Sequence, residues 1–197
     1  MRHWIKRGLW VLAALVAALV GAVAYLLVFY PMHQHCIKVA GGGFQVYADD
    51  HHGQLPFDTN GFCDALMLLV KSGDLSDPQN AWRFVTGVGD DGSVFRAALV
   101  SGAHIPEEKC SRVYVQGFRD TDDPEIAILF DRYSSPGGDH FHRPWGPLVR
   151  EVCLLDGSMQ IIAETNWAKF SSNQIERLVA HGIPRATAEH YYALTQR

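Results

Sequence analysis

Beyond its first residues the chain has no cluster of basic side chains, and it contains no internal repeat and no low-complexity tract. The missing basic patch argues against a nucleic-acid partner. The sequence also lacks Gly-x-Ser-x-Gly, His-Glu-x-x-His and the phosphate-binding loop, so no common hydrolase or nucleotide-binding motif points to an enzyme. With 197 residues, of which 48% are hydrophobic and 19% charged, and a formal net charge of −4, the composition is that of one modest globular domain plus an apolar segment.

Charged residues are also missing from the apolar run between Gly8 and Tyr30. Pro31 follows this run directly. A helix of this length rises about 1.5 Å per residue and can cross a hydrocarbon core of roughly 30 Å. No later segment is as long or as apolar. We therefore expect a single-span protein, with residues 1–31 forming a cytoplasmic N-terminus and transmembrane anchor and residues 32–197 an extracytoplasmic domain.

The charges that flank this run set its expected orientation. Arg2, Lys6 and Arg7 precede it, which by the positive-inside rule places the N-terminus in the cytoplasm and the C-terminal domain in the periplasm, tethered to the inner (plasma) membrane. A cleaved signal peptide is the alternative, because residues 22–24 (Ala-Val-Ala) fit a cleavage site. The apolar run continues to Tyr30, which favours the uncleaved anchor.

The four cysteines, all beyond the apolar run, are compatible with an oxidising compartment. An even number permits two disulfides in three connectivities, and buried thiols are an equal alternative. The residues concerned are Cys36, Cys63, Cys110 and Cys153.

Helical periodicity predicts four helices in the C-terminal part. The first runs from near Met32 to His52, with Pro31 either in its first turn or kinking one long helix, and Gly53 ending it. Gly41 to Gly43 oppose this helix unless another element packs closely there. The second spans residues 61–71 with Asn60 as N-cap and Gly73 after its end. Two short helices, residues 173–181 and 184–194, close the chain.

Four segments have the composition of strands, and residues 74–108 are predicted to be loop-rich with a short element near residues 95–100. The strands are expected at residues 112–116, 125–130, 150–155 and 158–163. Asp156-Gly157 between the last two predicts a type I′ hairpin, because that turn needs positive φ at both central residues. Val152, Leu154, Met159 and Ile161 are then expected to share one face. The predicted fold class is α+β.

In this order the pieces resemble type IV pilins and type II secretion pseudopilins, and more narrowly the pilin-like proteins of planctomycetes. The resemblance rests on an ordered set of short segments: Cys36, Tyr47-Ala-Asp-Asp-His-His-Gly-Gln-Leu-Pro56, Cys110, Tyr114, Ala127-Ile-Leu-Phe-Asp131, Asp139-His-Phe-His142 and Leu154-Leu-Asp-Gly-Ser158-Met. It implies a membrane helix that continues into an outside helix packed on a small antiparallel sheet. The prepilin peptidase signature is missing, since Leu9-Trp10-Val11 follows Gly8 and no acidic residue lies between Met1 and Tyr30.

Two polar clusters are candidate metal sites. Asp139, His140 and His142 form a D-H-x-H pattern of good zinc ligands, in a Gly- and Pro-rich loop that explains them without a metal. Asp120, Asp122 and Asp123 offer oxygens for calcium but lack the EF-hand spacing, which favours a solvated acidic turn. Residues 49–52 (Asp-Asp-His-His) form a further polar group. We therefore expect no cofactor, with zinc or calcium as the alternative.

The sequence supports three functional hypotheses. The first is a membrane-anchored, non-enzymatic pilin-like envelope protein that acts through protein–protein contact. The second is a single-helix accessory subunit of a larger membrane complex, and the third is a metal-dependent periplasmic enzyme. Expected partners are membrane lipid and other membrane or envelope proteins. Small residues in the anchor allow close helix packing, and loop-region aromatics either anchor a partner or belong to the core, which is expected for most of them. Those aromatics are Trp82, Phe84, Phe95, Phe118 and Trp145.

Overall fold

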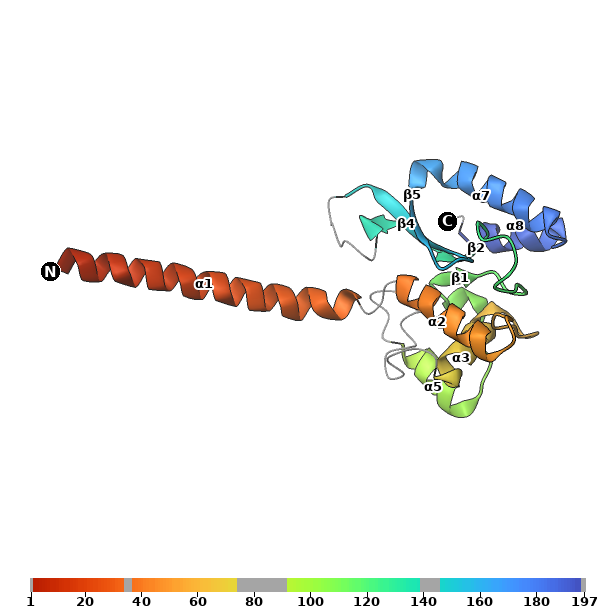
Figure 1. The fold of residues 1–197 in the computed structure, drawn as a ribbon, viewed down its shortest axis with the longest axis horizontal. Helices are drawn as coiled ribbons and strands as arrows, with labels where there is room; N and C mark the ends of the chain where they lie inside the picture. The colour runs from red at the N-terminus through yellow and green to blue at the C-terminus, as the bar shows by residue number, and fades with distance from the viewer. Residues whose placement is uncertain (1, 34–36, 74–91, 139–145, 196–197) are drawn as a thin grey trace. The chain divides into compact units, whose positions relative to one another are not determined.

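The structure is a computed structural model that describes residues 2–33, 37–73, 92–138 and 146–195. The chain divides into two compact units, Met1–Gln34 and His35–Arg197. The first unit contains one long helix, α1 (Arg2–His33), whose side chains are described from Trp10 to Tyr25. The second unit contains all the remaining elements (Figure 1).

An antiparallel sheet forms the centre of the second unit. Its strands are β1 (Arg112–Tyr114), β2 (Ala127–Asp131), β3 (Ser135–Pro136), β4 (Leu148–Leu154) and β5 (Met159–Ala163). The order is β1-β2-β4-β3, and β5 also pairs with β4. Together with the helices, this sheet confirms the α+β fold class. The two-residue strand β3 was not predicted.

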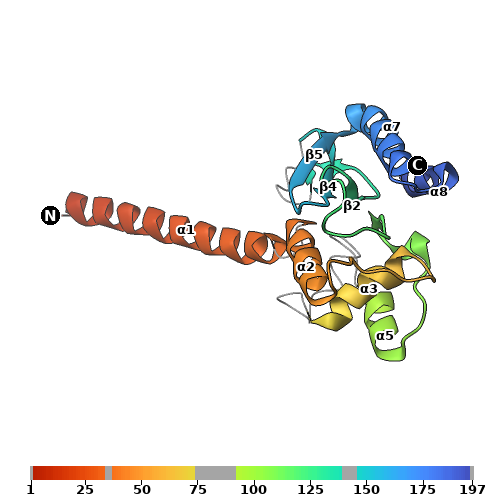
Figure 2. The same cartoon turned by 45° about the vertical axis from the view of Figure 1, so that its right-hand side comes forward.

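Helices lie on both faces of this sheet. Helix α2 (Ile37–Asp50) packs on the face that carries Cys153, while α7 (Glu164–Ala180) and α8 (Arg185–Ala193) cover the other face (Figure 2). On the α2 side the rings of Phe44 and Tyr114 stack with centroids 4.9 Å apart. On the opposite side Phe130 stacks on Tyr192 at 4.8 Å. Both faces are therefore core, which explains why every residue of β2 is buried.

Glycine allows α2 to approach the sheet closely. A Cβ on Gly41 would lie 2.8 Å from Cys153 Sγ and 3.3 Å from the carbonyl oxygen of Gly157. The expectation that another element packs against this glycine run is confirmed at Gly41. At Gly42, by contrast, a Cβ would meet nothing within 4 Å.

The first predicted helix ends two residues earlier than expected. Pro31 lies in the last turn of α1, the described part of α2 starts at Ile37, and α2 ends at Asp50 rather than His52. The end follows from the backbone: His52 and Gly53 have φ of 57° and 81°, and the Gly53 N–H donates to the Ala48 carbonyl at 2.7 Å.

Three further helical segments precede the sheet: α3 (Phe62–Ser72), α5 (Ser93–Ser101) and the 3₁₀ turn Glu107–Lys109. The predicted cap of α3 is wrong by one residue, because Gly61 is the N-cap and makes no side-chain hydrogen bond. The Asn60 N–H instead donates to Asp58 Oδ1 in a local turn. The predicted stop is confirmed, since Gly73 is the left-handed C-cap with φ of 83°.

The β4–β5 hairpin differs from the predicted type I′ turn. Gly157 has φ of 79°, but among the described residues His52 is the one non-glycine with positive φ, so Asp156 does not fit that turn. The Gly157 N–H donates to the Leu154 carbonyl, and the Leu154 N–H to Ser158. This is a three-residue loop with glycine in the left-handed position.

The longer loop shifts the register by one residue. Cys153 pairs with Met159 and Val152 with Gln160. Met159 and Ile161 therefore share a face with Cys153 and Glu151, not with Val152 and Leu154, and the predicted alternating set is wrong.

Helix α7 is longer and starts earlier than predicted, whereas α8 is one residue shorter than predicted at each end. Helix α7 starts at Glu164, directly after β5, instead of at residue 173, and α8 spans Arg185–Ala193. The extra turns of α7 bury Trp167, whose ring lies 5.5 Å from that of Phe130.

Candidate functional site

The described surface of α1 is apolar on every side. All side chains from Trp10 to Tyr25 are exposed, with exposed fractions of the large ones between 45% at Val23 and 78% at Trp10. A helix with no polar face is normally covered, either by protein or by lipid. This exposed apolar helix is the first candidate functional site.

The two sides of α1 differ in side-chain size. At 100° per residue, the small residues between Leu12 and Ala24 fall on one half of the helix and the large ones on the other. Trp10, Val11 and Tyr25, outside this stretch, fall on the same half as the small residues. The small half holds Ala13, Ala14, Ala17, Ala18, Gly21, Ala22 and Ala24, and the large half holds Leu12, Leu15, Val16, Leu19, Val20 and Val23. The small half can admit another helix at close range.

Taken over the residues whose side chains the structure describes, no helix is both long enough and apolar enough to cross a membrane.

The folded unit contains a row of buried charges that sequence reasoning missed. Arg112 Nε donates to Asp131 Oδ1 at 3.3 Å, and Asp131 Oδ2 accepts the Glu151 N–H at 2.9 Å. The exposed fractions of Arg112, Asp131 and Glu151 are 0%, 6% and 0%. These side chains lie across three neighbouring strands on the α2 side, so the row ties β1, β2 and β4 together. The signal for this row in the sequence is that charged residues occur within otherwise apolar strand segments.

A second buried arginine holds the other face of the sheet to the C-terminal helices. Arg150 makes two bonds to the Glu164 carboxylate, at 2.8 and 2.9 Å, and donates to the Thr195 carbonyl at 3.1 Å. Its guanidinium also lies 4.8 Å from the ring centroid of Trp167. The hydrogen bond from Arg150 lowers the pKa of Glu164 below its ordinary value. These contacts are structural, because the charges of Arg150 and Glu164 are paired with each other within the folded unit.

The most enzyme-like feature is a His–Asp pair beside a cavity of about 210 Å³. His104 Nδ1 contacts Asp64 Oδ2, and Asp64 Oδ1 accepts the Ile105 N–H at 3.3 Å. The lining comprises Asp58, Asn60, Asp64, Met67, Leu68, Lys71, Ala98, Gly102, Ala103 and His104. None of these described lining residues is a serine, threonine or cysteine.

The predicted zinc candidates Asp139, His140 and His142 lie outside the described residues. The chain enters that segment at Gly138, where a Cβ would come within 2.9 Å of Glu151 Oε1, so this backbone lies directly on the buried carboxylate. In the part of the chain that the structure describes, no three His, Cys, Asp or Glu side chains are grouped to hold a metal ion.

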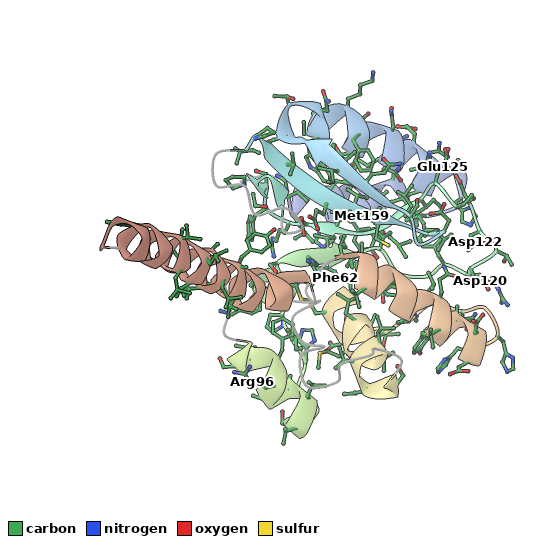
Figure 3. All side chains as sticks on the ribbon, turned by 60° about the vertical axis from the view of Figure 1, so that its left-hand side comes forward. Phe62, Arg96, Asp120, Asp122, Glu125 and Met159 are labelled. Atoms are coloured by element: carbon green, nitrogen blue, oxygen red, sulfur yellow. A yellow bond between two sulfur atoms is a disulfide. The ribbon has the colours of Figure 1, made fainter. Side chains whose placement is uncertain are left out.

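The acidic turn considered for calcium uses two of its carboxylates in ion pairs. Asp122 accepts the Arg119 N–H at 2.7 Å and pairs with His181 at 3.3 Å, and Asp123 accepts Arg177 Nη1 at 2.8 Å. Asp120 and Asp122 lie on the same side of the folded unit as Glu125, which also pairs with Arg177 (Figure 3). The turn therefore attaches to Arg177 of α7 and to His181, the residue that follows this helix. The Glu125 N–H, which donates to Asp123, and then Arg177 lower the pKa of Asp123 below its ordinary value.

The remaining candidate residues that the structure describes lie at the end of α2 or in the core. His51 and His52 are exposed at the end of α2, where the His51 ring stacks on Tyr47 at 3.8 Å. Phe95 and Phe118 are core residues with exposed fractions of 1% and 2%. Trp82, Phe84 and Trp145 lie outside the described residues.

Two of the cysteines form a disulfide. Cys63 of α3 is bonded to Cys110, just before β1. Cys153 is buried against α2, and Cys36 lies outside the described residues. The bond resolves part of the connectivity that the sequence left open.

Comparisons with known proteins identify no family: no family model, no curated protein and no solved structure matches this chain.

Proposed function

We propose that the chain is a membrane-anchored, non-enzymatic envelope protein of the pilin-like type that acts through protein–protein contact. The observation that carries this proposal is α1: it contains the uncharged run of residues 8–30, and every side chain described in it is exposed. A helix that is surrounded by lipid needs no polar face, because the lipid tails are apolar.

Two further observations support the orientation and the compartment. Arg2, Lys6 and Arg7 precede the apolar run and favour a cytoplasmic N-terminus. The Cys63–Cys110 disulfide fits an oxidising compartment for the second unit, such as the periplasm.

The pilin-like part of the proposal is supported by α2, which follows α1 in the chain and packs closely on an antiparallel sheet through Gly41. Two features differ from the pilin plan. Helices α7 and α8 cover the second face of the sheet, and the prepilin peptidase signature is missing. We therefore propose contact with envelope proteins, and we do not propose peptidase processing.

Alkaline carbonate extraction of membranes from cells that express the full chain tests the anchor. We expect the protein in the membrane pellet, and we expect replacement of Leu15 and Leu19 together by Lys to shift it to the soluble fraction. Each lysine at a span centre costs about 2.5–3.5 kcal/mol. The double alanine variant is the matched control and should stay in the pellet. Extraction of the wild-type chain by carbonate would contradict the proposal.

A single-helix accessory subunit is the second candidate, favoured by the small-residue half of α1. Replacing Ala14 and Ala18 by Ile crowds that half without adding polarity. If α1 docks against a larger membrane complex, this variant stays in the membrane but loses its co-purifying subunits in mild detergent. The control replaces Leu12 and Leu19 by Ile on the large half. Equal recovery of partners with both variants would exclude this candidate.

A further inference from the structure

The two edge strands of the sheet differ in burial. At one edge, all three residues of β1 are buried. At the other edge, β5 pairs with β4 alone among the described strands, and Ile161 has an exposed fraction of 41%. Met159 marks the beginning of this strand (Figure 3).

The register shows which backbone groups of β5 point outward. The Leu154 N–H donates to the Ser158 carbonyl, so hydrogen-bonded pairs recur at every second position, at Val152–Gln160 and Arg150–Ile162. The backbone groups of Met159 and Ile161 and the N–H of Ala163 then point away from β4. The Leu155 N–H, which donates to Ile126 on the β2 side, agrees with this alternation.

The described strand β5 itself carries none of the usual in-strand protections against strand pairing. Natural sheets protect edge strands with charged side chains, proline or bulges. The five residues of β5 (Met-Gln-Ile-Ile-Ala) contain no charge and no proline, and their pairing with β4 is regular. An unprotected, partly exposed apolar edge is a pairing surface.

A groove continues this surface beneath α7. Its volume is about 310 Å³, and its lining from α7 is one helical stripe: Asn166, Lys169, Phe170 and Asn173. From β5 the lining residues are Ile161, Ile162 and Ala163. The groove is therefore bounded by the same strand whose backbone groups point outward, with Phe170 and Ile162 as apolar lining.

We infer that β5 pairs antiparallel with β5 of a second copy of this chain, which joins the two sheets. The strand is self-complementary about Ile161: both backbone groups of Ile161 meet those of Ile161 in the second copy, and each Met159 carbonyl accepts the Ala163 N–H of the other copy. This register pairs both groups of Ile161, the Met159 carbonyl and the Ala163 N–H. A register shifted by one residue pairs none of them, because such a shift opposes inward to outward groups.

The same arrangement brings the α7 stripes together. Neighbouring strands lie about 4.8 Å apart, and a two-fold axis perpendicular to the sheet keeps both α7 helices on one face. Two helices that each lie over β4 and β5 are then separated by roughly 10 Å, a normal helix-packing distance. Phe170 of each copy would be covered in this interface. The inference does not depend on the proposed membrane anchor.

Site-directed crosslinking of the full chain tests the register. With Ile161→Cys, the two sulfurs meet at the two-fold axis, and we expect a disulfide-linked dimer under mild oxidation. Met159→Cys is the matched control, because positions 159 of the two copies lie about 13 Å apart, beyond disulfide reach. Mixing Met159→Cys with Ala163→Cys should restore the crosslink. No crosslink at Ile161, or equal crosslinking at Met159, overturns the inference.

A second variant separates strand pairing from association through α1. Ile161→Pro removes an outward N–H and leaves the β4–β5 ladder intact, so we expect a folded monomer by mass measurement in detergent. Ile162→Pro removes an inward N–H and should destabilise the domain instead. A wild-type monomer, a dimer that survives Ile161→Pro, or association only with another protein each overturns self-pairing. If carbonate extracts the wild-type chain from the membrane but the dimer forms, the proposed function fails and the self-pairing of β5 stands.

Discussion

At the residue scale, Gly41 and Gly42 are neighbours in α2 with opposite surroundings. A Cβ at position 41 would push into Cys153 and the Gly157 carbonyl, whereas one at position 42 meets open space. We predict that Gly41→Ala lowers the free energy of unfolding by about 1–3 kcal/mol through overpacking. Gly42→Ala should raise it by up to about 1 kcal/mol, because alanine favours the helix. Urea titrations of both variants measure this, and equal effects would contradict the close approach of α2 to the β4–β5 turn.

The Arg150–Glu164 contact predicts a pH dependence with a definite sign. The folded pKa of Glu164 lies below its unfolded value because Arg150 donates to the carboxylate. The contact therefore stabilises the fold above about pH 4, the ordinary range of a glutamic acid, and this stabilisation is lost as the pH falls through the folded pKa. We expect the wild type to be more stable than Glu164→Gln at pH 7, with the difference shrinking below pH 4. A difference that stays constant between pH 7 and pH 3 in urea titrations would refute the assignment.

At the element scale, the β4–β5 hairpin shows what a sequence pattern leaves undetermined. Asp156-Gly157 indicates a turn between two strands, and the strands are there, but the same dipeptide fits loops of two and three residues. Leu155 decides between them. Its side chain is buried and its N–H donates to the Ile126 carbonyl of the neighbouring chain segment, so it cannot pair with Ser158. A tertiary contact selects the register.

The start of α7 was missed for a similar reason. The segment from Glu164 to Ser172 contains Thr165, Asn166 and two serines, residues that favour caps and turns over helix interiors. Trp167 outweighs these preferences by packing on Phe130, stacking with Arg150 and donating its indole N–H to Thr195 Oγ1. The buried row through Asp131 escaped prediction likewise, because its members are brought together only by strand pairing.

The hairpin loop provides the element-scale prediction. Gly157 has φ of 79°, and the nearest atoms to a Cβ there are 3.9 Å away, so backbone conformation rather than space restricts this position. We predict that Gly157→Val lowers the free energy of unfolding by about 1–3 kcal/mol. Gly157→Asn should cost less, because asparagine tolerates the left-handed region. Thermal melts compare the two, and equal losses would mean that steric contact, not φ, limits the site.

At the scale of the whole molecule, the chain combines an apolar helix with a self-contained folded unit. The second unit has its own core, which includes both sheet faces and α3, and the Cys63–Cys110 disulfide lies within it. In composition, the uncharged apolar residues 8–30 likewise differ clearly from residues 32–197. The partner of the apolar helix leaves no comparable pattern in the sequence, since lipid and another apolar helix select the same residue types.

If the two units are independent, removing the first should change location without changing stability. We predict that a chain beginning at His35, exported to the periplasm behind a cleavable signal, is recovered in the soluble fraction. It should melt in one cooperative transition within a few degrees of the full chain in detergent, because the core it needs lies within residues 35–197. A truncated protein that stays in the membrane pellet would mean that the second unit carries its own membrane contact. One that melts far below the full chain would mean that α1 stabilises the fold of the second unit.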